Sequence, residues 1–303
     1  MAPKRRTDSP SSSSTDDSRD QPGARPRRAE PREVVELRAL REAHPELAPA
    51  IDMQLALIDL QRRVQSRVPI PIHQLSAVHL ARHVVEQRPA LAFDEIPLDW
   101  TEVRLMVRQT VDILGRFGSL DQDSIVRLQA IAREPERFLT IVREWYGAAP
   151  GGATPGAAPA DPTGLLDQVL TLAMRPFLAR CAQSLLPQLD LRAWTTPHCP
   201  LCGGEAEFAA ITSAADRLLL CSRCTGAWPY DPIACPYCRN SNRARITSFE
   251  SRDGRYRLYG CDSCRRYLKA FDGRRSTRGA LLAVDTIATL PLDAAAIQRG
   301  YRS

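Results

Sequence analysis

The sequence lacks the features that would place it in a membrane or on a secretion route. No window reaches the 18 or more uninterrupted apolar residues that a membrane helix needs, because the most hydrophobic region, residues 165–191, contains Asp167, Arg175, Pro176 and Arg180. The N-terminal KRR is not followed by an apolar segment, so we expect neither a secretory nor a twin-arginine signal. These absences predict a cytoplasmic protein that does not enter the membrane.

The sequence also lacks a Gly-rich phosphate loop, a nucleophile elbow and a pair of catalytic carboxylates. His79 and His83 lie four residues apart on a predicted helix, with His73 nearby, and this spacing can ligate a metal ion. The segment HLARH has no glutamate in the position that the HExxH motif of zinc proteases requires, so we interpret these residues as ordinary surface or core histidines. We therefore predict that the protein is not an enzyme.

The N-terminal two thirds of the chain have a helical texture after a polar start. Residues 1–30 contain mainly Ser, Pro, Arg and Asp and no apolar run, which predicts a disordered tail. From residue 31 to 196, apolar residues recur at helical spacing, and the segments PLDW and SLDQDS supply helix-start residues. We predict a helical domain, with four to six helices before a flexible Gly/Ala/Pro linker at 147–162 and a further helix that starts at Asp161 and Pro162 and ends near residue 189.

Nine cysteines are present, and eight of them form four Cys-x-x-Cys pairs within residues 197–279. In a reducing cytosol such pairs are metal ligands or redox dithiols rather than structural disulfides. The ninth, Cys181, lies in an apolar helical pattern, so we expect a small buried side chain there. Residues 280–303 return to a helical texture and predict a closing C-terminal helix, with Pro291 in its first turn.

The gaps between successive pairs are 18, 10 and 22 residues, and each long gap predicts a β-hairpin. In the first, the runs EFAAI and RLLLC flank a polar turn; in the second, ARITSF and YRLYG flank Asp253 and Gly254, a strong turn signal. A hairpin with a cysteine pair at both ends brings the two pairs together, as in a zinc ribbon. We therefore predict two small β zinc-ribbon or rubredoxin-like modules in tandem. The predicted ligands are Cys199, Cys202, Cys221 and Cys224 for the first ion, and Cys235, Cys238, Cys261 and Cys264 for the second.

An alternative is a crossed arrangement, in which the first pair joins the third and the second joins the fourth. In either arrangement four thiolates saturate the ion, which leaves no open position for hydrolytic catalysis. A structural zinc site contributes about 10–16 kcal/mol to folding, so we expect this region not to fold without metal. Iron suits the same ligand set, and the sequence leaves zinc and iron open. The residue after each second cysteine often needs a positive φ, which favours Gly203 and makes Arg265 the least suitable.

Two other functions are compatible with the four-cysteine pattern. A nucleic-acid-binding zinc ribbon would use the fourteen Lys and Arg against eight Asp and Glu in residues 197–279, but two thiolate-bound divalent ions lower this surplus to about two charges. The aromatic residues of the region could stack on bases, although in so small a domain they more often cover its core. These residues are Trp228, Tyr230, Tyr237, Tyr256 and Tyr259. A rubredoxin-like electron carrier would use iron in the same sites.

The order of the C-terminal motifs is similar to that of a known family. The segments CPLCGG, LLLCSRCTGAW, CPYC, YGCDSCRRYLKAFD and VDTIATLPLDAAAIQRGY together resemble FdhE, the formate dehydrogenase accessory protein family, over roughly residues 197–303. The resemblance implies a helical domain followed by two four-cysteine metal sites. It also implies a cytoplasmic maturation factor that contacts the catalytic subunit of a formate dehydrogenase. Several further motif positions have no assigned task and serve either the fold or partner contact. They are Tyr267, Leu268, Lys269, Asp285, Asp293, Gly300 and Tyr301.

Overall fold

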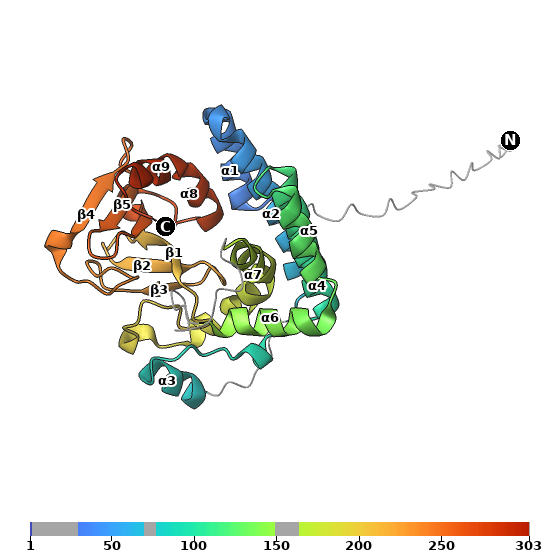
Figure 1. Cartoon of the computed structure of the whole chain (residues 1–303). Helices are drawn as coiled ribbons and strands as arrows, with labels where there is room; N and C mark the ends of the chain where they lie inside the picture. Colours follow the sequence, from blue (N-terminus) through green and yellow to red (C-terminus); the bar gives the residue numbers. More distant parts are fainter. Residues whose placement is uncertain (2–29, 70–76, 149–163, 303) are drawn as a thin grey trace. The chain divides into compact units, whose positions relative to one another are not determined.

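The structure, a computed structural model, describes Met1 and residues 30–69, 77–148 and 164–302 (Figure 1). Most of the predicted tail at 1–30, most of the predicted linker at 147–162, the predicted helix start at Asp161 and Pro162, and His73 lie outside the described residues. Within the described ranges, no helix has the length and apolar character needed to span a lipid bilayer.

As far as residue 185, the described parts of the chain are helical and contain no strand, as the sequence predicts. In chain order they are α1 (Arg32–Ala43), α2 (Ala48–Gln65), α3 (Ala77–Val85), α4 (Trp100–Arg116), α5 (Gln122–Ile131), α6 (Pro135–Gly147) and α7 (Leu165–Leu185). The predicted helix-start residues cap two of them. The Asp99 carboxylate accepts from Thr101 N–H at 2.8 Å at the start of α4, and the Asp121 carboxylate accepts from Ser124 N–H at 2.7 Å at the start of α5.

Helix α7 packs against α2 and α4 and lies between them and the strands (Figure 1). Pro176 stands inside it and has no N–H, so the Leu172 carbonyl lacks its usual donor in the helix. The Gln61 side chain of α2 donates to that carbonyl at 2.9 Å. The proline is thus accommodated by a hydrogen bond that also joins the two helices.

The second half of the chain forms a single sheet from the two predicted hairpins. Its strands are β1 (Ala206–Ile211), β2 (Arg217–Cys221), β3 (Ala227–Pro229), β4 (Ile246–Glu250), β5 (Tyr256–Cys261) and β6 (Tyr267–Asp272). The order across the described residues is β3-β2-β1-β6-β5-β4. Strands β1 and β2 are antiparallel, as are β4 and β5, which confirms both hairpins. The predicted turn at Gly254 is present, with a φ of 68°.

The two hairpins are joined by β6, a strand that the sequence pattern does not predict. β6 pairs antiparallel with β5 and parallel with β1, where Ala209 lies opposite Ala270. All residues of β6 are buried, because Leu268 and Ala270 face the helical core while Tyr267 and Phe271 pack toward the C-terminal helices. The two modules are therefore halves of one continuous sheet.

The C-terminal segment contains two helices rather than one, α8 (Leu282–Ala288) and α9 (Leu290–Gln298). Pro291 lies in the first turn of α9, as predicted. The hydrophobic core continues from the helices into the first half of the sheet. It includes Val103, Phe177, Cys199 and Leu219, so the first group of cysteines is part of the same apolar cluster as the helices.

Candidate metal centres

The first group of cysteines lies where the β1–β2 hairpin meets the helices. It consists of Cys199, Cys202, Cys221 and Cys224, whose sulfur atoms all lie within 4.8 Å of one another. The Sγ atoms of Cys199 and Cys224 are 3.5 Å apart, as are those of Cys202 and Cys221. All four side chains are buried, and burial raises the pKa of the Cys199 thiol well above its usual range. Four thiolates are stable in such a dry site only with a bound cation.

The second group lies at the end of the β4–β5 hairpin that corresponds to the position of the first group on β1–β2. Its side chains are more exposed to solvent than those of the first group. It consists of Cys235, Cys238, Cys261 and Cys264, again within 4.8 Å of one another. The Sγ atoms of Cys235 and Cys264 are 3.7 Å apart, and those of Cys238 and Cys261 are 3.6 Å apart. Cys238 is exposed and Cys264 is half-buried. The grouping of both sets is sequential, not crossed.

The sulfur positions fit a tetrahedral metal ion. A zinc–sulfur distance of about 2.3 Å in a tetrahedron separates the sulfurs by about 3.8 Å. The observed separations of 3.5–3.7 Å are close to this value and far longer than a disulfide, and the cysteines are free thiols. Each group could therefore hold one four-coordinate ion, and the donor set suits zinc as well as iron.

All four cysteine pairs have the same backbone geometry. At the first, Cys199 N–H donates to the Gly204 carbonyl at 2.9 Å and Gly203 N–H donates to the Cys199 carbonyl at 3.0 Å, and the same two bonds recur at the other pairs. The residue after each second cysteine has a positive φ; these residues are Gly203 (71°), Thr225 (58°), Arg239 (61°) and Arg265 (60°). Arg265 is therefore one of three residues other than glycine that adopt this conformation. The least favourable of them is the β-branched Thr225, and not Arg265 as the sequence suggests. Gly204 is needed because a Cβ there would lie 2.7 Å from Cys221 Sγ.

Arginine side chains dock the first site onto the helices. Arg223 lies between Cys221 and Cys224 and donates to the carbonyls of Trp145 and Tyr146, at 2.9 and 3.1 Å, near the C-terminal end of α6. Its guanidinium also lies over the Trp145 ring, 4.3 Å from the centroid. Arg175 of α7 donates to the Ser222 carbonyl at 2.7 Å. The loop that carries two of these cysteines is thus fixed to two helices.

A third arginine orders residues 229–234, the joint between the two cysteine hairpins. The buried guanidinium of Arg217 donates to the carbonyls of Asp231 and Ala234, at 3.2 and 2.9 Å, and lies beside the rings of Tyr230 and Tyr259. Burial lowers the pKa of Arg217. The Asp231 carboxylate accepts from Ile233 N–H at 2.8 Å. The joint therefore has a defined conformation.

Similarity to known proteins is present in both the sequence and the fold. No family model matches the sequence. A curated protein, the FdhE homolog of Shewanella oneidensis, is 28% identical over 194 residues, which cover 63% of this chain and 60% of that protein. The chain thus spans about 60% of the length of this relative. The crystal structure of the FdhE protein from Pseudomonas aeruginosa matches 89% of this chain and 91% of that chain, with a TM-score of 0.59 and 22% sequence identity.

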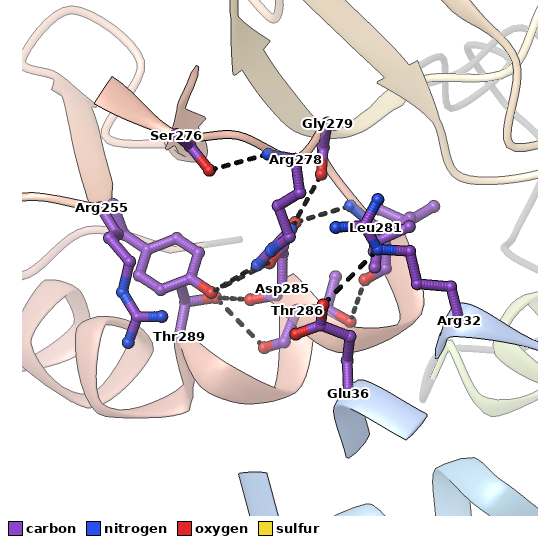
Figure 2. Close-up of polar contacts among 12 residues, drawn as sticks. Arg32, Glu36, Arg255, Ser276, Arg278, Gly279, Leu281, Asp285, Thr286 and Thr289 are labelled. Carbon is purple, nitrogen blue, oxygen red and sulfur yellow. Dashed lines mark hydrogen bonds and ion pairs between the residues drawn. The ribbon is translucent and has the colours of Figure 1, made fainter. Parts of the chain in front are cut away.

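The chain resembles FdhE proteins in sequence and in fold. In this FdhE-like fold, the motif positions at the C-terminus support the structure. The Asp285 carboxylate is fully buried and accepts from Tyr256 Oη at 2.9 Å, Arg278 Nη1 at 3.1 Å and Leu281 N–H at 2.7 Å (Figure 2). Burial, together with the carboxylate, raises the pKa of Tyr256. This network attaches α8 to β5.

A second group of contacts attaches α9 to β6. The Asp293 carboxylate accepts from Tyr267 Oη at 2.7 Å and from Lys269 Nζ at 2.6 Å. These are the motif residues YLK of β6 and the second aspartate of the terminal motif. Their acidic and basic groups pair with each other, so their contribution is to the FdhE-like fold.

The closing Gly-Tyr of the FdhE-like motif packs on the second cysteine hairpin. The Tyr301 ring lies on β5 at Gly260, where a Cβ would be 2.6 Å from the ring, and Tyr301 Oη donates to Asp262 at 2.7 Å. Arg265, the residue after the last cysteine, donates to the Arg299 carbonyl at 2.8 Å. The end of the chain thus braces the last cysteine pair.

The aromatic residues of the FdhE-like cysteine region are engaged within the fold. Trp228 and Tyr256 are buried, while Tyr230, Tyr237 and Tyr259 are half-buried. Tyr237 stacks under the Arg266 guanidinium, 3.7 Å from the ring centroid.

Cys181 is fully buried in α7, as predicted, and burial raises the pKa of its thiol to about 12. The roles of Arg217 and Arg223 are absent from the sequence prediction. The signal for Arg223 is its place between two ligands, and Arg217 has no local signal.

Proposed function

We propose that this protein is a cytoplasmic accessory factor that binds the catalytic subunit of a formate dehydrogenase and is needed for the maturation of that enzyme. The main support for this proposal is the similarity to FdhE proteins in both sequence and fold. The ordered set of cysteine and terminal motifs supports the same proposal, since the structure gives these motifs interlocking roles.

The eight cysteines are the ligands of two metal ions, zinc or iron, with one ion in each group. The sulfur separations and the burial of the first group support this assignment. A saturated four-thiolate ion has no open position for substrate or water, so the sites stabilise a binding surface and perform no hydrolysis. The proposed role is accordingly not enzymatic.

Copurification tests the proposal directly. The full chain, tagged and expressed in its native host under anaerobic conditions, should retain the formate dehydrogenase catalytic subunit after washing. Recovery of the chain without any oxidoreductase subunit, at expression levels where that enzyme is present, would contradict it.

The exposed Cys238 favours a second candidate function, a one-electron carrier that uses iron in the second site. An exposed ligand shortens the path for electron transfer to a partner. Protein purified without oxygen would then be coloured and would bleach reversibly on reduction. Colourless protein that contains zinc excludes this function and leaves the accessory role unaffected.

A further inference from the structure

A cavity of about 650 Å³ opens beside the first metal centre, between α3, the C-terminal end of α6 and the segment before Cys199. Both cysteine regions contribute to its wall, through Gly203 after the first pair and Arg239 after the third. Its volume is typical of a site for a small ligand. Cys202 of the first cysteine group also lines the cavity, whereas no residue of the terminal motif does.

Two of the imidazoles that line the cavity face each other. His79 and His83 lie four residues apart on α3, so that both project from the same side of the helix. Their Nε2 atoms are 2.9 Å apart, and their ring centroids are 4.5 Å apart. The two ring nitrogens are hydrogen-bonded to each other, and a bound cation would replace the proton of this hydrogen bond.

The separation of these nitrogens matches that of two ligands on one metal ion. Zinc–nitrogen bonds of about 2.0–2.1 Å separate two nitrogens by about 2.9–3.4 Å at ligand angles between roughly 90 and 109°. The 2.9 Å separation lies within this interval. Neutral imidazole is a common ligand of zinc, nickel and copper, and the spacing of four residues on a helix is the one by which two histidines share an ion.

We propose that His79 and His83 bind one divalent transition-metal ion of the zinc and nickel class in this cavity, separately from the eight cysteines. Among the described residues, no other His, Cys, Asp or Glu completes a group of three ligand atoms within 4.8 Å there. Two protein ligands leave the other coordination positions of the ion to water or to a donor group that enters the cavity.

The surroundings of the pair set the expected strength of binding. His83 Nδ1 is buried and has no hydrogen-bond partner within the described part of the chain. Tightly bound ions use histidines whose second ring nitrogen donates to a carboxylate or carbonyl, and His83 lacks that support among the described residues. The ion should therefore exchange more readily than the ions of the four-cysteine centres.

Zinc stoichiometry of the full-length protein tests this site without reference to any client. After equilibrium dialysis against excess Zn²⁺, elemental analysis should find one more zinc ion per chain than after a further dialysis with excess imidazole. His79→Gln and His83→Gln should each abolish this extra ion and leave the tightly bound metal unchanged. His44→Gln, at an exposed histidine outside the cavity, is the matched control and should retain it.

Signals of the imidazole protons in the unmodified protein give a second measurement that needs no variant. Addition of Zn²⁺ should shift the signals of His79 and His83 and spare that of His44. An extra ion that persists in both glutamine variants, or the absence of any extra ion in the unmodified protein, would overturn the proposal.

Discussion

At the scale of single residues, the four cysteine loops show how much backbone conformation matters around a metal site. Each loop needs a residue with positive φ after its second cysteine, yet glycine occupies only the first of these positions. Gly203 adopts this conformation without strain, whereas Thr225, Arg239 and Arg265 do so at a cost in free energy. The need for this conformation can be predicted from the cysteine spacing. That Arg265 is accepted in this conformation cannot be predicted, because its side chain is held by a hydrogen bond to the Arg299 carbonyl, which is distant in sequence.

Replacement of Thr225 by glycine should therefore stabilise the protein. Thr225 has a φ of 58°, and its side chain is exposed, so the substitution relieves backbone strain without loss of packing. We expect an increase of about 1 kcal/mol in the free energy of unfolding, measured by urea denaturation. Gly203→Ala is the reciprocal test. It should destabilise by a similar amount, because a Cβ there has the same unfavourable φ and lies 3.1 Å from Pro89. A neutral or destabilising effect of Thr225→Gly would contradict this account.

Among substitutions of single residues, Asp285→Ala should cause the largest loss of unfolding free energy. Its carboxylate has no exposed surface and compensates the charge of Arg278, whose side chain is 11% exposed. Asp285→Ala leaves that guanidinium buried without its counter-charge, which should cost about 3–5 kcal/mol of unfolding free energy. The matched control is Asp190→Ala, which removes the exposed ion pair with Arg192 and should change the unfolding free energy far less. Equal losses in the two variants would show that the network in Figure 2 does not stabilise α8.

At the scale of secondary-structure elements, the hairpins were predictable and their joining was not. The cysteine spacing and the turn at Asp253 and Gly254 are local signals, and they predict β1–β2, β4–β5 and the sequential grouping of the ligands. The parallel pairing of β1 with β6 depends on residues about sixty positions apart, for which the sequence offers no local signal. The terminal motif is similar: its aspartates are visible in the sequence, but their partners Tyr256, Tyr267 and Lys269 come from other strands.

The two cysteine hairpins should release their ions at different rates. All four ligands of the first site are buried, whereas Cys238 of the second site is exposed and Cys264 is half-buried. From protein first dialysed with excess imidazole, which removes any ion held by His79 and His83, a chelator in excess should therefore remove one ion quickly and the other slowly, as followed with a metal-sensitive dye. Cys238→Ser should eliminate the fast phase, and Cys202→Ser should eliminate the slow one. A single rate for both ions, or loss of the fast phase in Cys202→Ser, would be incompatible with the structure.

At the scale of the whole molecule, the first cysteine group belongs to the helical core and the second lies toward the surface. Cys199 and Cys221 share one apolar cluster with α4 and α7, and Arg223 ties their hairpin to α6. The second hairpin and the ordered joint at residues 229–234 present exposed groups, among them Ile233 with 41% of its surface accessible. The sequence marks this joint by its two prolines, and the structure shows that Arg217 and Asp231 hold it. We expect this ordered, partly apolar surface to contact the proposed client, the formate dehydrogenase catalytic subunit.

A charge at this joint should weaken client binding without loss of stability. Ile233→Asp places a carboxylate on the exposed side of the joint, and recovery of the formate dehydrogenase catalytic subunit in copurification should fall at least about tenfold. Val126→Asp on α5, where the side chain is 58% exposed, is the control and should leave recovery unchanged. Thermal unfolding of both variants checks that the fold is retained. Equal recovery with Ile233→Asp and the unmodified chain would remove the joint from the client surface.

The accessory role itself is tested most directly by formate dehydrogenase activity in extracts of a native host that lacks this chain. We expect the activity to be lost although the catalytic subunit is still synthesised, and to return when the full chain is expressed again. Full formate dehydrogenase activity in the strain without the chain would show that the chain is not needed for maturation of the enzyme.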